Sequence, residues 1–308
     1  MNKLIITGGL GFIGKNFYSL VKNLWDEIII LDKATYAADI HFINKIIRKK
    51  DRIIFGDVCD YSFLDNTISN DYNIVHFAAE SHVDKSFTSS IEFTKNNALG
   101  THTLLEVCRS KNVKKIIVIS TDEVYGSTED YINEDSSLKP TNPYSASKAG
   151  ADLISQTYYK TFKLPLVIVR PNNVYGPRQF AEKIIPALIN AVHGGGRLRI
   201  HGEGKTERFF LHVNDLSKAL ILIFNNFIPG EIYNINGSTK IKIIDLIKYV
   251  ADYKKIDINK FADYVQNRPF NDQVYTINGD KIRKLGWREE MDFFSSLNIL
   301  IDEKSYIK

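Results

Sequence analysis

The sequence contains little cysteine and no long hydrophobic run. Its 308 residues include only Cys59 and Cys108, neither in a Cys-x-x-Cys motif, and its seven histidines are dispersed. Because zinc sites need cysteine and histidine at close spacing, we expect no metal site and two reduced core cysteines. No apolar stretch is long enough to cross a membrane, and the N-terminal apolar run breaks into glycines, unlike a signal peptide. We therefore expect a cytoplasmic protein with no membrane partner.

An excess of one charge is also missing. The formal net charge is +4, and basic residues such as those around Arg48 are scattered rather than gathered in a block. A solvated basic face is a better interpretation of that segment than a nucleic-acid patch, so we expect no nucleic-acid partner. The hydrophobic content of 44% is ordinary for a globular protein and leaves enzymes and binding proteins open.

Continuous apolar runs rich in β-branched residues recur in the first half of the chain, separated by segments able to form helices. Continuous rather than alternating runs are typical of strands buried on both faces of a parallel sheet. We therefore predict an α/β fold with a Rossmann-type doubly wound parallel sheet. The runs begin at Lys3, Glu27, Arg52, Asn73, Lys115 and Leu166.

The regular rhythm weakens after Pro177. Helices are predicted over 181–196 and 241–254, with short strands at 198–204 and 231–237. We expect a first domain over residues 1–177, to which some later segments return, and a smaller mixed lobe over 178–308.

A glycine-rich turn, "GGLGFIGKNF", follows the first predicted strand and opens a helix. Gly9, Gly11 and Gly14 fit G-x-G-x-x-G, and Gly8, Gly11 and Gly14 fit G-x-x-G-x-x-G. Glycines at such a turn let the backbone approach a pyrophosphate, which then lies against the positive end of the helix. A tight strand–helix turn without a ligand is the alternative, and the acid described next argues against it.

The second predicted strand ends at Asp32, eighteen residues beyond Gly14. An acid there accepts hydrogen bonds from a ribose diol and repels a 2′-phosphate, which favours NAD over NADP. The adjacent Lys33 weakens that preference. Asp57, at the end of the third strand, is expected near the adenine.

Two further clusters carry chemistry. Tyr144 and Lys148 are four residues apart in "YSASK", a spacing that puts them on one face of a helix. We expect the Lys148 ammonium to lower the pKa of the Tyr144 phenol, so that it acts as a general base on a sugar or alcohol hydroxyl. Thr121, Asp122 and Glu123 directly follow the fifth strand, where ligand crevices lie in open α/β sheets. An exposed helical pair and a solvated turn are the alternatives.

These motifs together resemble a known family. "TGGLGFIG", "HFAAESHVD", "STDEVYG", "NPYSASKAGAD" and the segment from Asn172 resemble nucleotide-sugar 4,6-dehydratases of the extended short-chain dehydrogenase/reductase superfamily. The resemblance runs from Lys3 to Lys284. The stretch "NRPFNDQ" (267–273) is most similar to the UDP-glucose 4,6-dehydratase domain of plant-type UDP-rhamnose synthases, whereas the dTDP-glucose enzymes usually have Gly-His where this chain has Phe270 and Asn271.

The resemblance implies a redox-neutral, NAD-dependent reaction on an NDP-glucose, in rhamnose-type deoxysugar biosynthesis. Tyr144 would take the proton of the 4-hydroxyl while C4 gives hydride to NAD. Glu123 would then remove the C5 proton, and Asp122 would protonate the departing 6-hydroxyl. Hydride returns to C6, leaving a 4-keto-6-deoxy sugar, and Thr121 would hydrogen-bond the 4-oxygen. Elimination of water needs a proton donor and a proton acceptor at the same time, and two adjacent carboxyl groups can supply both.

The resemblance also implies which residues bind each ligand, with NAD on the first domain and the nucleotide sugar against the second lobe. Val274 departs from the family, whose members usually carry Arg there. A homodimer is implied through 96–111 and the helix carrying Lys148. The implied cofactor residues are Gly8, Gly11, Phe12, Ile13, Gly14, Asp32, Lys33, Thr35, Asp57, Val58, Phe77, Ala78, Ala79, Ser81, Asn96, Ser120, Tyr144 and Lys148. The implied substrate residues are Ser81, His82, Thr121, Asn173, Glu182, Lys183, Ile184 and Asn271, with Arg208 and Arg268 clasping the diphosphate.

The acid pair separates the leading hypothesis from its rivals. Sugar 4-epimerases of this fold resemble "SSATVYG" at this place, without acids, and UDP-glucuronate decarboxylases resemble "TSEVYG", with the Glu alone. A non-catalytic NAD-binding protein usually loses the Tyr or the Lys, and both are present here. The sequence leaves the identity of the nucleotide open. The two nucleotides differ by a methyl group on the base and a hydroxyl on the sugar, and a methyl group in a pocket contributes only about 1–3 kcal/mol to binding. We favour UDP-glucose over dTDP-glucose only on the resemblance of residues 267–273.

Overall fold

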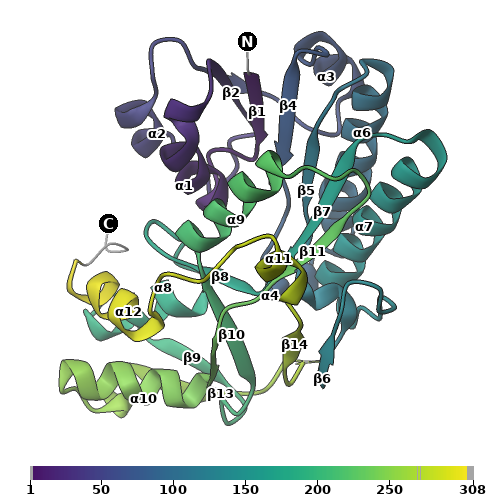
Figure 1. Cartoon of the computed structure of the whole chain (residues 1–308). Helices are drawn as coiled ribbons and strands as arrows, with labels where there is room; N and C mark the ends of the chain where they lie inside the picture. The colour runs from purple at the N-terminus through teal and green to yellow at the C-terminus, as the bar shows by residue number, and fades with distance from the viewer. Residues whose placement is uncertain (1–2, 269, 271, 304–308) are drawn as a thin grey trace.

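The largest part of the fold is a parallel β-sheet. The computed structural model describes residues 3–268, 270 and 272–303, and within them this sheet has seven strands in the order β11–β7–β5–β4–β1–β2–β3 (Figure 1). All six apolar runs form strands of this sheet, which confirms the predicted α/β doubly wound class. The strands are β1 (Lys3–Thr7), β2 (Glu27–Asp32), β3 (Arg52–Phe55), β4 (Tyr72–His76), β5 (Ile116–Ile119), β7 (Leu166–Pro171) and β11 (Ile232–Ile235).

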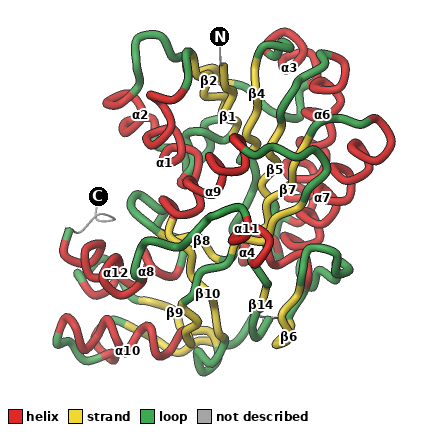
Figure 2. Tube along the Cα trace, viewed as in Figure 1, coloured by secondary structure: helices red, strands yellow, loops and turns green. Residues whose placement is uncertain are grey.

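Both faces of this sheet are covered by helices, which explains why its strands are apolar throughout (Figure 2). In β1, Leu4 and Ile6 pack into one core and Ile5 into the other, and all three are fully buried. Burial of each such side chain contributes about 1.5–3 kcal/mol. One face carries α1 (Phe12–Val21), α2 (Ile40–Ile46), α9 (Val213–Asn225) and α11 (Asp280–Lys284), and the other α3 (Tyr61–Thr67), α6 (Gly100–Ser110) and α7 (Pro143–Phe162).

A smaller lobe lies beyond one end of the main sheet, with a core of its own (Figure 1). Tyr175, Phe210 and Phe293 meet at the centre of this core, their ring centroids 5.1–6.1 Å apart. The smaller lobe contains a three-stranded sheet with the order β12–β10–β8 and a two-stranded sheet of β13 and β9. Its elements are β8 (Asn173–Tyr175), α8 (Ile184–Val192), β9 (Leu198–His201), β10 (Glu207–His212), β12 (Thr239–Lys242), α10 (Ile243–Lys254), η4 (Ile258–Lys260), β13 (Ala262–Val265) and α12 (Phe293–Asp302).

The chain crosses between the two parts several times. After β10 it returns through α9 to β11, which pairs in parallel with β7 at the edge of the main sheet. Near its end, β14 (Tyr275–Ile277) pairs with β6 (Thr128–Ile132), which follows the fifth strand. The predicted strand at 231–237 therefore belongs to the main sheet, and the division of the chain at residue 177 stays a prediction.

Four of the five remaining short elements follow the carboxyl end of β4 or β5. The strand order reverses between β1 and β4, because β2 and β3 are added on one side of β1 and β4 and β5 on the other. Open α/β sheets form a ligand crevice at such a point. Cys59 and Cys108 are free thiols. In the part of the chain that the structure describes, no helix combines the length and the apolar character that a membrane span requires. The short elements are η1 (Lys22–Leu24), α4 (Val83–Ser86), α5 (Ser90–Phe93), the π-helix η2 (Thr94–Leu99) and the 3₁₀ helix η3 (Asp122–Tyr125).

Candidate active site

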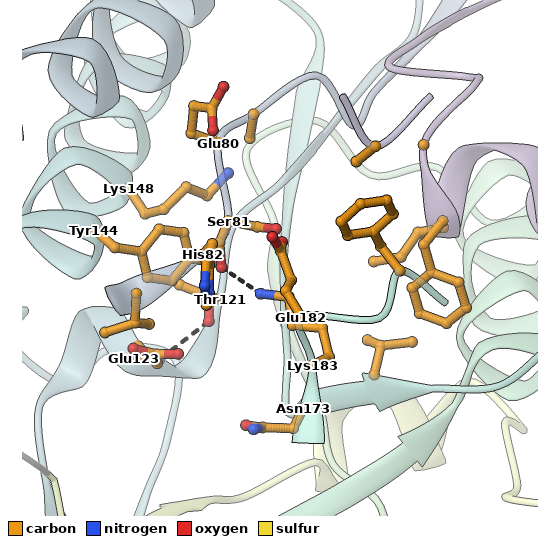
Figure 3. Close-up of a pocket in the computed structure, with 18 of the residues that line it drawn as sticks. Glu80, Ser81, His82, Thr121, Glu123, Tyr144, Lys148, Asn173, Glu182 and Lys183 are labelled. Atoms are coloured by element: carbon orange, nitrogen blue, oxygen red, sulfur yellow. Dashed lines mark hydrogen bonds between the residues drawn. The ribbon is translucent and has the colours of Figure 1, made fainter. Parts of the chain in front are cut away.

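A cavity of about 460 Å³ lies at the carboxyl ends of the main-sheet strands and extends to the smaller lobe. Every catalytic, cofactor and substrate residue implied by the family resemblance lines it except Asn271, which lies outside the described residues. Tyr144, Lys148, Thr121 and Glu123 gather on one side, with Glu182 and Lys183 beside them (Figure 3). Segments far apart in the sequence thus meet at one site.

The glycine loop forms the floor of the dinucleotide end. Gly8 has φ +67°, and a Cβ atom on it would lie 2.6 Å from the Ala78 nitrogen. A Cβ atom on Gly14 would lie 2.4 Å from the Gly8 carbonyl oxygen. Gly9 does not line the cavity, and a Cβ atom on it would contact Ile30 instead. The spacing that matters is therefore Gly8, Gly11 and Gly14, with Gly11 at the start of α1, where a helix favours anions.

Asp32 closes this end of the cavity. Its Oδ2 accepts a hydrogen bond from the Leu10 backbone N–H at 3.0 Å and its Oδ1 accepts one from Ala34 at 2.8 Å. Burial raises the pKa of this carboxyl, and the two N–H donors act against the rise. The Lys33 ammonium lies 2.7 Å from an Asp57 oxygen, so its charge is paired there. Lys33 therefore weakens the preference for NAD over NADP less than the sequence alone suggests.

Asp122 lies in η3 immediately after the fifth strand, with 2% of its surface exposed. Its Oδ2 accepts a hydrogen bond from the Asn172 amide at 2.6 Å, and the Thr121 hydroxyl donates to its Oδ1 at 3.1 Å. Burial, and then the charge of Glu123, raise the pKa of Asp122 to about 7. This carboxyl is therefore half protonated near neutral pH, as a general acid requires.

Glu123 has a different environment. Its Oε2 lies 3.4 Å from the Asn142 amide and 3.5 Å from the Tyr275 hydroxyl. Burial raises its pKa, while the charge of Arg208, the Asn142 hydrogen bond and Lys183 act to lower it. Burial thus raises the pKa of both acids, but cations oppose the rise at Glu123, whereas the charge of Glu123 adds to the rise at Asp122.

Tyr144 and Lys148 project from the first turns of α7. Asn142 and Ser145 form a capping box that fixes where this helix begins. The Lys148 ammonium donates to the Ile119 carbonyl at 2.5 Å, and burial lowers its pKa to about 8. The expectation that Lys148 lowers the pKa of Tyr144 is wrong for this structure: burial, together with the nearby Glu123 and Asp122, raises it. The ammonium is directed at the strand rather than at the phenol.

The smaller lobe contributes cations and a further acid, Glu182, to the cavity. Lys183 donates to the Ser81 carbonyl, and Glu182 accepts a hydrogen bond from the Tyr36 hydroxyl at 3.0 Å. The guanidinium of Arg208 lies 5.0 Å from the centre of the Tyr275 ring and donates to backbone carbonyls. These contacts position positive charge where the cavity meets the second lobe.

Arg268 is held by the first part of the chain. Its guanidinium pairs with both oxygens of Asp84 in α4, at 2.6 and 2.9 Å. It lines the cavity, and its predicted grip on a diphosphate stays a prediction. Val274, the departure from the family, is buried, and its backbone carbonyl accepts from the Thr128 N–H at 3.0 Å. A valine at this position therefore packs where β14 meets β6.

The lining residues that were not predicted from the sequence include four beside the acid pair: Asn142, Asn172, Asp272 and Tyr275. Asn172 directly follows β7, so the rule that selected Thr121 after the fifth strand could have found it too. Asp272 and Tyr275 arrive from a distant segment without a local signal. Across the described ranges, no three His, Cys, Asp or Glu side chains are grouped so as to hold a metal ion.

Comparison with known proteins identifies the family to which the chain belongs. A family model described as GDP-mannose 4,6 dehydratase matches residues 5–299 of the chain. The chain belongs to the nucleotide-sugar 4,6-dehydratase family. A dTDP-D-glucose 4,6-dehydratase of Dictyostelium discoideum is 37% identical to this family member, over 100% of the chain and 81% of the relative.

Two further relatives show how far the similarity reaches. A trifunctional UDP-glucose 4,6-dehydratase/UDP-4-keto-6-deoxy-D-glucose 3,5-epimerase/UDP-4-keto-L-rhamnose-reductase of Arabidopsis thaliana is 37% identical over 97% of the chain. The chain spans 46% of that relative's length. The crystal structure of the dTDP-glucose 4,6-dehydratase DesIV from Streptomyces venezuelae, with NAD and TYD bound, superposes with a TM-score of 0.94 at 36% identity, over 97% of this chain and 96% of that one. The family and its fold are thus shared along the whole chain.

Proposed function

We propose that this dehydratase converts an NDP-glucose to the NDP-4-keto-6-deoxyglucose in an NAD-dependent reaction with no net redox change. The observation that carries the proposal is the acid pair of Asp122 and Glu123, buried in unlike environments beside Tyr144 and Lys148. An epimerase or a dehydrogenase needs no proton donor and acceptor one residue apart. An elimination of water needs both at once.

The residues present fit the dinucleotide. The loop at Gly8 and Gly14 leaves no room for a Cβ atom, and α1 begins at the cavity. Asp32, with Lys33 already paired, favours a ribose diol over a phosphate. NAD, when bound, supplies the hydride acceptor for C4, the donor for C6 and a positive charge that favours the phenolate of Tyr144.

Each catalytic side chain has a defined task in this proposal. Tyr144 takes the proton of the 4-hydroxyl, and Lys148, held by the Ile119 carbonyl, keeps positive charge nearby. The resulting 4-ketone acidifies C5, and Glu123 removes that proton. Asp122 gives its proton to the C6 oxygen, which leaves as water. When hydride returns to C6, Glu123 gives its proton back to C5. The protons then balance, because Tyr144 takes one from the 4-hydroxyl and Asp122 gives one to the departing oxygen.

We place the nucleotide against the cationic end formed by Lys183, Arg208 and Arg268, because a diphosphate needs such charge. UDP-glucose is our favoured substrate and dTDP-glucose the next, on the resemblance of residues 267–273. Identity to the relatives named for each nucleotide is the same, 37%, and carries no preference. A role in rhamnose-type deoxysugar biosynthesis follows from the product and belongs to the same proposal.

A homodimer is the oligomer we propose. Leu99 of η2 is 49% exposed, and Leu153 and Phe162 of α7 are 53% and 48% exposed. η2 packs against α7, which covers one face of the main sheet, and a second copy of the chain would cover these exposed apolar side chains. Sedimentation analysis of wild type and of Leu153→Glu tests this: a monomer in both cases refutes the dimer. The cytoplasmic location stays a prediction from the sequence.

Parallel assays with UDP-glucose, dTDP-glucose and GDP-mannose test the proposed reaction. The expected product is lighter than the substrate by one water and contains a ketone, and no reduced cofactor is released. An epimerase would give an isomer of equal mass, and a decarboxylase would act on UDP-glucuronate and release carbon dioxide. Binding of NAD without turnover of any of these sugars would refute the enzyme assignment.

A further inference from the structure

The acid of the proposed elimination has a partner on the neighbouring strand. Asn172 directly follows β7, and Asp122 lies after the fifth strand, which pairs with β7 in parallel. The Asn172 amide nitrogen donates to Asp122 Oδ2 at 2.6 Å, and both side chains are buried, with 3% and 2% of their surface exposed. The backbone N–H of Asn172 donates to the Ile235 carbonyl at 3.0 Å, which fixes the residue to the edge strand β11.

The other end of this amide is unused. Among the described residues, Asn172 Oδ1 is a buried acceptor without a hydrogen-bond partner. A half turn of the amide exchanges its nitrogen and its oxygen at little steric cost, since the two atoms have nearly the same size. In one orientation Asn172 donates to a carboxylate, and in the other it accepts the proton of a carboxylic acid. An amide can therefore serve either protonation state of its partner.

Asp122 needs such a partner, because the reaction changes its state. It must be a carboxylic acid before water leaves and a carboxylate afterwards. A cation at position 172 would stabilise only the carboxylate, and an apolar side chain would leave a buried polar atom unpaired in both states. We propose that Asn172 is a positioning residue for the elimination step, whose amide holds Asp122 in place both as an acid and as a carboxylate. This inference rests on the proposed function.

The other groups around Asp122 do not replace the amide. Glu123 is an anion on the same turn, Tyr144 is a phenol on α7, and Arg208 on β10 contributes only a weakly opposing charge. Thr121 is the remaining hydrogen-bond partner, and it contacts the other oxygen, Oδ1. Loss of Asn172 therefore leaves Asp122 Oδ2 without a donor, and the side chain can turn away from the leaving oxygen.

Isosteric variants test the inference in single-turnover experiments. The change Asn172→Leu should leave C4 oxidation, seen as the appearance of reduced cofactor, within about threefold of wild type. It should slow the disappearance of the reduced cofactor by about 10–100-fold, since a displacement near 1 Å costs that much. The change Asn172→Asp should support near-normal elimination below about pH 6, where two carboxyls share a proton. Above about pH 8 it should behave like Asn172→Leu.

A matched control is Asn226→Leu. The side-chain amide of Asn226 is a hydrogen-bond donor too, but it donates to the Leu222 backbone carbonyl, at 3.0 Å, at the exposed end of α9. The control should leave both steps unchanged, and thermal denaturation with NAD titration shows that each variant is folded.

The outcomes separate the two levels of the argument. Equal slowing of both steps, no slowing, or an Asn172→Asp variant without pH-dependent recovery overturns the positioning role while wild-type turnover stands. Wild type that dehydrates no nucleotide sugar overturns the proposed function itself, and this inference with it.

Discussion

The burial of Asp122 makes a quantitative prediction about the pH dependence of water elimination. Burial and the charge of Glu123 raise its pKa from 3.8 to about 7, a shift of about three units. Each unit changes the ratio of acid to carboxylate tenfold. At pH 7 about half of the molecules then hold the proton, against roughly one in a thousand for a carboxyl with an ordinary pKa. The fold thus supplies an acid that an exposed aspartate would not provide.

The sign of the dependence follows from the role of each acid. A proton donor must be protonated, so the rate of elimination should fall about tenfold per unit as the pH rises above about 7. Replacement of the donor by Asp122→Asn should slow elimination by about 10²–10⁴-fold and remove this fall, because an amide has no acidic proton. In the proposed mechanism, oxidation at C4 depends on Tyr144 and Lys148 and should continue, so we expect reduced cofactor to accumulate on the enzyme.

Stopped-flow absorbance of the reduced cofactor measures both steps in one trace, its rise for oxidation and its decay for elimination. Asp130→Asn is the matched control, because Asp130 is an exposed acid on β6. A wild-type elimination rate that stays flat to pH 9 would refute the role of burial. An Asp122→Asn variant that retains the fall above pH 7 would show that another group is the acid.

The same pKa shift has a consequence for stability. The folded protein binds a proton at Asp122 more tightly than the unfolded chain, so this residue lowers the free energy of unfolding as the pH rises from 3.8 to about 7. At pH 8 the Asp122→Asn protein should therefore be more stable than wild type, by up to about 4 kcal/mol at 1.36 kcal/mol per unit. Below pH 4 the difference should vanish, which thermal denaturation at several pH values checks.

Two further changes probe the cofactor end of the site, and a third probes a buried ion pair. The change Gly14→Ala puts a Cβ atom 2.4 Å from the Gly8 carbonyl oxygen, so NAD affinity by calorimetry should fall at least about tenfold, and wild-type affinity would contradict the close approach. The change Arg170→Met leaves the fully buried Asp152 carboxylate unpaired and should lower the free energy of unfolding by about 3–5 kcal/mol, most of it restored by adding Asp152→Leu. The change Asp32→Asn removes the charge that repels a 2′-phosphate, so the affinity ratio of NADP to NAD should rise; an unaltered ratio would assign that selectivity elsewhere.

The sheet and the cofactor loop could be predicted because their patterns are local. A continuous apolar run such as the one from Lys115 indicates by itself a strand that is buried on both faces. The order of strand, glycines and helix likewise predicts the cofactor-binding turn. The strand at 231–237 was predicted, but its place beside β7 depends on packing between distant segments. The spacing of residues in the sequence does not predict which strands are neighbours in the sheet.

The site shows the same division. The spacing of Tyr144 and Lys148 gives a shared helix face, but it does not say that the ammonium turns to the Ile119 carbonyl. The predicted lowering of the Tyr144 pKa was wrong for that reason. Residue spacing also does not reveal that the phenol is buried beside two acids. Arg268 and Asp84 pair across 184 positions, a contact that no local pattern announces. Geometry at this range comes only from the folded chain.

The pairing of β14 with β6 also bears on how the protein is made. Tyr275, on β14, faces Glu123 from 152 positions further along the chain, and its hydroxyl donates to Asp272 at 2.5 Å. A ribosome completes the edge strand β11 of the main sheet at Ile235, forty residues before Tyr275 is added. The residues of the dinucleotide half of the cavity are therefore synthesised before those that complete the surroundings of the Glu123 carboxyl. Glu123 acquires its full set of neighbours only when nearly the whole chain has been synthesised.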